Sequence, residues 1–282
     1  HQSLTLQWID KDRAPLVFGR IISLRSITSA IAFGAIYIAL ELGGVAYAWL
    51  YVLFGGVTIA IAVYCWSAYP EFKASVEQRK TIVLRRRYWL WYALVFMSGA
   101  RRQIFVVFAV FLMVEKFGFS ASEMSLLFLV NMWATFYMAP KIGRFIQRFG
   151  ERRGLILEYA GLLVVFTGYA FATEAWMGVA LYLLDHVFFA MAIAIKTYFQ
   201  KIADPRDIAS SSGVSFTISH IVAVVIPAAF GFLWLISPAY VFLAGTAMAG
   251  VSLVLAMMVP RDPTPGHVAL VSFGKYAPAG AK

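Results

Sequence analysis

The chain has 282 residues, of which 61% are hydrophobic and 13% are charged, and its mean hydropathy is +0.77. Because soluble domains carry about 25% charged residues, this composition excludes an ordinary soluble protein and indicates an all-α integral membrane protein. The formal net charge is +10, but the basic residues lie in short runs between apolar stretches, so membrane topology explains them better than nucleic-acid binding.

Eight apolar stretches are predicted to be transmembrane helices, since about 20 apolar residues cross a bilayer. The first 25 residues are predicted to be a loop in which residues 16–24 lie at the membrane interface. Pro140 is predicted to end the fourth span. Residues 261–282, rich in proline and glycine, are predicted to form a disordered tail. In chain order the predicted spans cover residues 26–42, 46–66, 87–115, 124–138, 155–173, 175–198, 208–236 and 239–259.

The basic residues are distributed unevenly between the two sides of this predicted bundle. In the loops of one side only Lys116 is basic, whereas the ends of the chain and the other loops carry nearly all remaining lysines and arginines. By the positive-inside rule the basic side is the cytoplasm. We therefore expect both termini of the chain on the cytoplasmic side of a plasma membrane, which is the inner membrane in a bacterium.

The third span carries Arg101, Arg102 and Gln103 in its middle. An arginine at this depth costs roughly 2.5–3.5 kcal/mol on insertion scales, so exposure to lipid is disfavoured. These side chains are therefore expected to face a protein interior, to pair with acids or to line a water-filled cavity. Neighbouring residues on a helix point about 100° apart, so at most one of the two arginines points straight into a cavity. The sequence leaves open which one does.

Other polar residues are predicted to share this depth. Asn131, Asp185, His186 and His220 lie near the midpoints of the fourth, sixth and seventh spans, and Tyr182 flanks Asp185 on the same helix face. Secondary transporters bind their substrates near the midplane of the bilayer. The candidate residues for substrate binding or proton coupling are Arg101, Arg102, Gln103, Asn131, Tyr182, Asp185, His186 and His220.

The charges of these residues allow two interpretations. Two arginines against one aspartate leave positive charge, which favours an anionic substrate or a mobile proton partner. Alternatively, an arginine simply pairs with Asp185 and holds two helices together. His220 and Asn131 can equally form hydrogen bonds between helices. Glu158, close to the cytoplasmic end of its span, is interpreted as a structural partner of the basic loop before it and not as a transport residue.

The loop GRFIQRFGERR at residues 143–153 resembles the G-x-x-x-D-R-x-G-R-[RK] loop of major facilitator superfamily transporters. In this sequence Gln147 stands in place of the usual aspartate, and Glu151 stands where a basic residue is common. In that family the loop joins the second and third helices of each six-helix half, on the cytoplasmic side. The residues assigned to this conformational motif are Gly143, Arg148, Gly150 and Arg152.

The resemblance implies that the eight spans are helices 5 to 12 of a twelve-helix transporter, so we expect a fragment that lacks helices 1 to 4. Arg101 and Asp185 then fall on helices 7 and 10, which line the central cavity in this family. The implied divisions are the end of the N-terminal half at residues 1–66, a cytoplasmic linker at 67–87, the C-terminal six-helix half at 88–260 and the tail at 261–282.

The sequence therefore predicts a proton-coupled secondary active transporter that moves a small organic, anionic or zwitterionic solute by alternating access. Its partners would be the lipid bilayer, the solute and protons, and the resemblance implies a monomer. The alternative is a non-transporting membrane assembly factor or sensor on the same fold. An enzyme is disfavoured because no nucleophile motif, phosphate loop or metal-ligand spacing is found, and no cofactor or metal is predicted for a chain whose single cysteine is Cys65.

Overall fold

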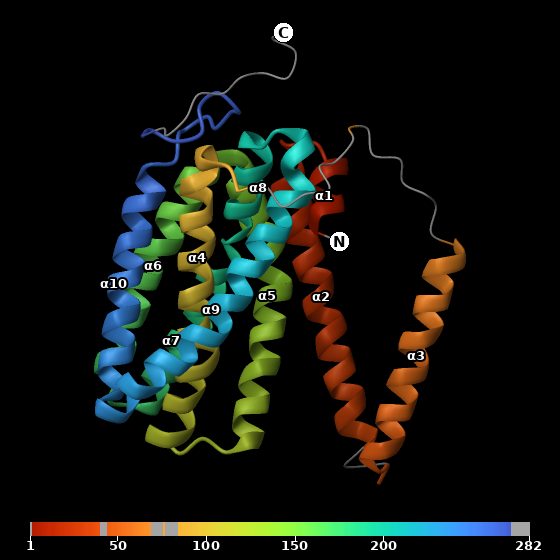
Figure 1. The fold of residues 1–282 in the computed structure, drawn as a ribbon. Coiled ribbons are helices and arrows are strands. Elements are labelled where there is room, and N and C mark those ends of the chain that lie inside the picture. Colours follow the sequence, from red (N-terminus) through yellow and green to blue (C-terminus); the bar gives the residue numbers. More distant parts are fainter. Residues whose placement is uncertain (1, 40–43, 69–75, 77–83, 272–282) are drawn as a thin grey trace.

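The computed structural model describes residues 2–39, 44–68, 76 and 84–271. Within these ranges the chain is helical, and its β pairing is an isolated bridge between Thr264 and His267. The predicted all-α fold is confirmed (Figure 1). The α-helices are α1 (Gln2–Trp8), α2 (Ala14–Tyr37), α3 (Tyr47–Ala68), α4 (Trp89–Gln103), α5 (Ala121–Phe149), α6 (Glu151–Phe171), α7 (Ala175–Ala190), α8 (Ile193–Ile202), α9 (Ile208–Ile236) and α10 (Pro238–Met257).

In the described part of the chain, seven helices are long and apolar enough to cross a membrane, against the eight predicted. The difference is α5, which contains the predicted fourth span at residues 124–138. Polar residues such as Glu123, Asn131 and Lys141 lower the hydropathy of α5, although it runs alongside the other helices of the bundle (Figure 1). The predicted count of eight apolar spans is therefore one too high.

The first 25 residues are largely helical and not the predicted loop. Helix α1 precedes a short turn, and α2 begins at Ala14 with Pro15 in its first turn. Proline is favoured there because its missing N–H would have no partner within the helix. Arg20 and Arg25 are exposed on α2, where long side chains can extend toward the membrane surface. Charged residues therefore do not prevent this helix from starting early.

Two spans depart from regular α-helix near the predicted polar residues. After α4 the chain continues as π-helix over Ile104–Ala109 and again over Leu112–Lys116. The predicted span 175–198 is broken at Met191 and Ala192, between α7 and α8. Turns of π-helix are found frequently at functional sites, so these irregularities mark the region around α4 and α7.

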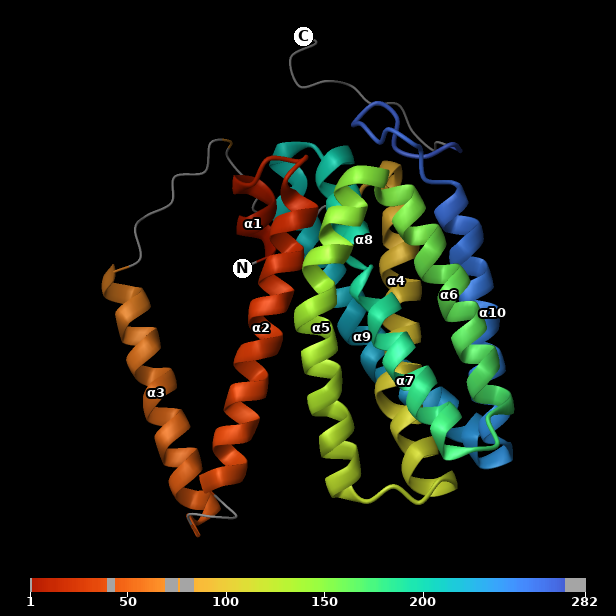
Figure 2. The same ribbon diagram turned by 180° about the vertical axis from the view of Figure 1, so that it is seen from behind.

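Helices α4 to α10 form one bundle, in which α7 and α8 together make a single broken span. Helix α6 lies beside α10, α9 crosses α4, and α2 packs along α5, as both views show (Figures 1 and 2). Helix α3 stands apart from the bundle, and none of the residues in its most apolar window is buried. Most of the buried core lies between α4, α6, α7, α8 and α10, with further buried residues on α5 and α2.

Helices α2 and α5 approach each other closely at two glycines. A Cβ atom added at Gly19 would lie 2.5 Å from the carbonyl oxygen of Ala139, and one added at Gly143 would lie 2.5 Å from that of Pro15. A side chain at either position would therefore clash with the facing backbone, and small residues such as glycine allow helix backbones in membranes to approach closely. Gly143, which the sequence assigned to the loop motif, therefore makes a packing contact between α5 and α2.

Pro140 lies inside α5 and does not end it, contrary to the prediction. Proline has no N–H, so the carbonyl of Phe136, four residues earlier, loses its helical hydrogen bond. The hydroxyl of Ser23 on α2 donates to this carbonyl at 2.6 Å, and Ser23 is buried. The neighbouring helix thus replaces the hydrogen bond that proline removes, as expected where water is scarce.

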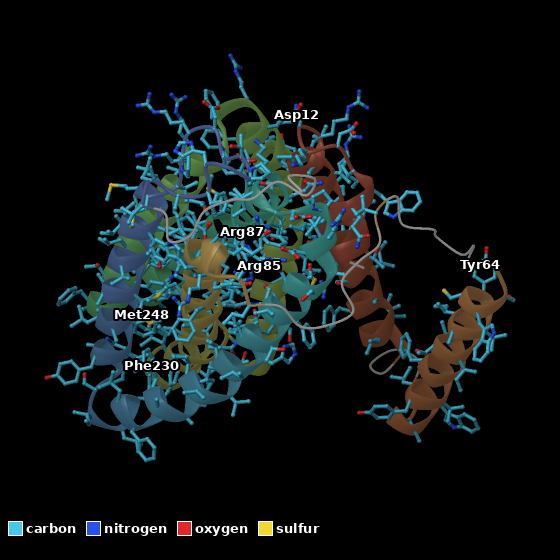
Figure 3. All side chains as sticks on the ribbon, turned by 45° about the horizontal axis from the view of Figure 1, so that its top comes forward. Asp12, Tyr64, Arg85, Arg87, Phe230 and Met248 are labelled. Carbon is cyan, nitrogen blue, oxygen red and sulfur yellow. The ribbon has the colours of Figure 1, made fainter. Side chains whose placement is uncertain are left out.

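One end of the bundle, at the top of Figure 1, carries the starts of α4 and α9, the α5–α6 turn and the segment after α10; we call it the basic end. Arg85 forms an ion pair with the buried carboxylate of Asp207, and Arg87 and the Tyr88 hydroxyl each lie 3.2 Å from it. Figure 3 shows Arg85 and Arg87 close to each other. The hydrogen bond with Asp207 raises the pKa of Arg85, so this guanidinium stays charged. The predicted linker at residues 67–87 lies mostly outside the described residues.

The segment after α10 packs against the helices at the basic end. The sequence predicted a disordered tail over residues 261–282. The Tyr198 hydroxyl donates to the carbonyl of Val268 at 2.5 Å. Val268 and Ala269 are both buried, because their apolar side chains cover the end of the bundle. The prediction is therefore wrong for residues 261–271, and residues 272–282 lie outside the described part.

We expect Ser23→Ala to lower the free energy of unfolding by about 1–3 kcal/mol, because it leaves the buried Phe136 carbonyl without a donor. The loss should shrink in a Pro140→Ala background, where an N–H is available to that carbonyl. Thermal unfolding in detergent measures both effects. Ser26→Ala is the control, since the Ser26 hydroxyl donates to the carbonyl of Ile22 in its own helix. An equal loss with and without Pro140 would contradict this explanation.

Candidate functional site

The two adjacent arginines of α4 point to different environments. Arg101 is fully buried, and Arg102 is exposed. This answers the question that the sequence left open, because only Arg101 points into the bundle. The neighbouring Gln103 is half-buried. The two guanidinium groups therefore do not share one site, contrary to the predicted grouping.

Arg101 makes three contacts inside the bundle. Its Nε donates to the carbonyl of Met97 at 3.2 Å, one helical turn earlier. Its guanidinium lies over the ring of Tyr159, 4.3 Å from the centroid, and its Nη2 is 3.8 Å from Oε1 of Glu158. Both partners lie on α6. Arg101 therefore joins α4 to α6 through an aromatic face and a buried carboxylate.

Glu158 belongs to this buried group and is not the partner of the basic loop that the sequence suggested. Its side chain is fully buried, and neither carboxylate oxygen has a hydrogen-bond partner among the described residues. The prediction failed because it began the span at Leu155, whereas α6 begins at Glu151. The helical spacing of the apolar residues around Glu158 would have indicated that this side chain faces the core. Glu158 lies on the same helix face as Leu155, Tyr159 and Leu162, which are all buried.

Asp185 on α7 completes the group. It is fully buried, its two carboxylate oxygens have no hydrogen-bond partner in the described part of the chain, and its charge interacts with those of Arg101 and Glu158. The tyrosines 169 and 182 are buried close to it. The ion pair of Arg101 is formed with Glu158, so the structure does not show the predicted direct pair with Asp185.

The charge balance of this buried group is the reverse of the predicted one. One guanidinium faces two carboxyl groups, whereas the sequence suggested two arginines against one aspartate. Removing charges from water costs several kcal/mol per ion even in real proteins, and like charges at short range cannot easily both ionise. The arrangement can therefore neutralise one carboxylate with Arg101, while the second is neutral only if it binds a proton.

Three other predicted residues, Tyr182, His186 and Asn131, differ in their burial and in their contacts. Tyr182 packs against Phe105, with ring centroids 4.9 Å apart, and His186 packs edge-on to the same ring at 4.6 Å. His186 is half-buried, and its Nδ1 lies 3.3 Å from the Tyr182 carbonyl of its own helix. Asn131 on α5 is buried, and its amide has no hydrogen-bond partner among the described residues.

His220 is not brought to the buried group. Its ring is exposed on α9, packs against the tilted ring of Phe216 with centroids 3.9 Å apart, and bonds through Nδ1 to the Phe216 carbonyl at 2.9 Å. These contacts stay within one helix. The depth along a helix was therefore insufficient to place His220, because the face of α9 on which it lies is not enclosed by its neighbours.

A second, basic group lies around Arg102, and the sequence pattern did not indicate it. Lys196 on α8 is half-buried, with its Nζ 5.6 Å from the ring centroid of Phe18 on α2. Arg102 and Arg25 are near enough for their charges to repel that of Lys196, and Arg102 also acts on His186. None of the three cations forms an ion pair within the described ranges. This group can attract an anion.

The predicted loop motif forms the turn between α5 and α6 at the basic end. Gly150 joins the helices with a φ of +86°, a conformation that favours glycine. Arg148 is exposed beside the ring of Phe149, and Arg152 is half-buried. Glu151, which departs from the family pattern, forms an ion pair in the structure, because Lys201 lies 2.9 Å from its buried carboxylate.

An enclosed bundle of apolar helices with ionisable groups between them defines a multi-pass membrane protein. The family model for the Major Facilitator Superfamily matches residues 1–227 and also residues 91–279, so the chain belongs to this family of membrane transporters. A comparison with curated proteins found no match. Within the described residues, no group of three or more His, Cys, Asp or Glu side chains could hold a metal ion.

We expect Arg101→Gln to lower the free energy of unfolding by about 3 kcal/mol or more, because it leaves two buried carboxyl groups without a counter-charge. Adding Glu158→Gln should restore part of this loss. Unfolding in detergent measures both variants. Arg102→Gln is the matched control, one residue away but exposed, and should change stability little. Equal losses for Arg101→Gln and Arg102→Gln would contradict this assignment.

Proposed function

We propose that this transporter couples the movement of protons to that of a small organic solute that is anionic or zwitterionic, by alternating access. The observation that carries the proposal is the buried group of Arg101, Glu158 and Asp185, in which two carboxyl groups face one guanidinium. Secondary transporters use chains of intramembrane carboxyl groups as proton sites. The chain can therefore bind the coupling ion with residues of its own.

Asp185 is the proposed proton carrier. Glu158 has the guanidinium of Arg101 at 3.8 Å, whereas Asp185 has neither an ion pair nor a hydrogen bond in the described part of the chain. In a dry interior the carboxyl without a direct partner is the one that gains most from binding a proton. Release of that proton would leave a second negative charge beside Arg101 and favour a different arrangement of α4 and α7.

The basic group around Arg102 is the proposed solute site. Arg102, Lys196 and Arg25 carry three positive charges without a paired acid, which favours a carboxylate-bearing solute. Arg102 follows Arg101 directly on α4. A solute bound to Arg102 can therefore shift the short segment that also holds the buried proton site, which links the two events mechanically.

The alternative remains a membrane assembly factor or sensor that does not transport. The observation in its favour is that Arg101 and Glu158 are enclosed within one bundle, where they can act as a structural ion pair alone. The two functions differ in one respect. Only the transporter needs the proton on Asp185 to exchange during turnover.

Transport into proteoliposomes tests the proposal, with a panel of labelled monocarboxylates, dicarboxylates and amino acids. Wild-type protein should accumulate at least one solute when a pH gradient is imposed. Asp185→Asn should abolish this accumulation but retain solute exchange across the membrane, because asparagine mimics the protonated carboxyl. Asp12→Asn, at an exposed position, is the matched control.

Arg102→Gln should raise the KM for the same solute about tenfold, the effect of losing one hydrogen bond to a charged group. Asp185→Asn with undiminished accumulation would overturn the proton role. Folded wild-type protein that moves no solute of the panel, when it is tested together with the helices 1 to 4 that the resemblance implies, would favour the assembly factor or sensor.

A further inference from the structure

Three arginines from two distant segments meet at a pocket on the basic end. The pocket has a volume of about 470 Å³ and lies between the α5–α6 turn and the segment after α10. Arg152 and Arg153 come from the first turn of α6, and Arg261 comes from the segment that follows α10. The carbonyl of Arg261 lies 4.0 Å from the position of a Cβ added at Gly150, which places the two segments side by side.

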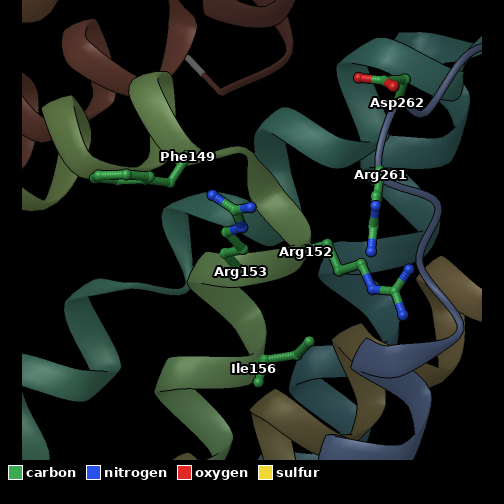
Figure 4. A pocket seen from close by; sticks show the side chains of 6 residues that line it. All are labelled: Phe149, Arg152, Arg153, Ile156, Arg261 and Asp262. Atoms are coloured by element: carbon green, nitrogen blue, oxygen red, sulfur yellow. The ribbon is translucent and has the colours of Figure 1, made fainter.

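The guanidinium groups of this pocket have no paired acid. None of the three arginines forms an ion pair or a side-chain hydrogen bond within the described ranges, and Asp262 is the one acidic residue in the lining. In Figure 4 the side chains of Arg152 and Arg261 extend toward each other, and Arg153 points toward Phe149. The pocket therefore concentrates positive charge from two sides. The carboxylate of Glu151, which is close by, does not neutralise this charge because it is paired with Lys201.

Basic residues at this end are expected from membrane topology alone, because cytoplasmic loops are rich in lysine and arginine. Topology explains their number but not their convergence. Arg144 and Arg206 are exposed at the same end, as Arg153 and Arg261 are, but they do not line the pocket. The convergence of Arg152 and Arg261 across separate segments instead resembles a site that grips an anion between planar guanidinium forks.

We propose that this pocket binds a phosphate group. Guanidinium forks match the oxygens of phosphate in pairs, and three arginines against one aspartate leave a positive excess that suits its charge. The walls formed by Phe149 and Ile156 are apolar and lie at the end of membrane-spanning helices. Basic pockets in this position bind lipid head groups, and a free phosphate presents the same chemistry. The bound group would link the α5–α6 turn to the segment after α10.

This proposal does not depend on transport, and it is tested by ligand-induced stabilisation of the full chain in detergent. The probes are inorganic phosphate, short-chain phosphatidylglycerol, and diacylglycerol of the same chain length, which lacks the phosphate. Because a ligand that binds only the folded state stabilises it, the unfolding temperature should rise in a saturable way. A rise with phosphatidylglycerol alone assigns the site to a lipid head group, and a rise with phosphate as well assigns it to phosphate in general.

The double variant Arg152→Gln/Arg261→Gln should weaken binding of the active probe about tenfold or more, the effect of losing hydrogen bonds to a charged group. The control Arg144→Gln/Arg206→Gln removes the same charge from the same end and should leave binding nearly unchanged. Asp262→Asn removes the negative charge of the pocket and should tighten binding roughly twofold to fivefold. This gain keeps the test decisive if the double variant fails to fold.

Three results would overturn the proposal. The first is that neither phosphate nor phosphatidylglycerol stabilises the wild-type chain. The second is that diacylglycerol stabilises it as much as phosphatidylglycerol does, which would assign the effect to the acyl chains. The third is that the control double variant loses as much affinity as Arg152→Gln/Arg261→Gln, since binding would then follow the total surface charge.

Discussion

The buried charge of Arg101 is the constraint on which the rest of the bundle depends. A guanidinium can be kept away from water only if the protein supplies compensating groups, and here these are the ring of Tyr159, the carboxylate of Glu158 and the nearby Asp185. They come from α6 and α7, so α4 must be held against both helices. The group therefore specifies the relative positions of three helices and concentrates titratable chemistry at one depth.

The contact between α2 and α5 shows how the same shortage of water shapes a contact without charges. Gly19 and Gly143 bring the two backbones together, and Ser23 satisfies the carbonyl that Pro140 leaves free in α5. Small residues and a single hydroxyl thus perform what apolar side chains do in a soluble core. The contact attaches α2 to the bundle, while α3 stands apart.

The sequence predicted the features that depend on composition and on position along a helix. The all-α membrane fold followed from hydropathy. The resemblance of residues 143–153 indicated the family that the family model shows. The depth of Arg101 and Asp185 along their spans predicted two of the residues of the buried group. The predictions that failed depended on the direction in which a side chain points or on the residues that it contacts. His220 has a mid-span position but lies on an open face of α9, and its exposure comes from its neighbours.

Glu158 and Pro140 were misread for related reasons. Each was interpreted by a local rule, a charge near a span end and a proline as a helix stop, and each is accommodated by a residue far away in the sequence. Arg101 compensates Glu158, and Ser23 compensates Pro140. A local sequence pattern does not reveal that a residue far away in the sequence provides the missing charge or hydrogen bond. The helical stripe shared by Glu158, Tyr159 and Leu162 was the one local signal that pointed inward.

The proposed coupling depends on a proton held by a carboxyl group inside the bundle, and infrared spectroscopy of the carboxyl stretch observes such a proton directly. At neutral pH the wild-type protein should show a band of a protonated carboxyl that is lost in Asp185→Asn and kept in Asp12→Asn. A spectrum without such a band, or a band unchanged by Asp185→Asn, would contradict the assignment of the proton to Asp185.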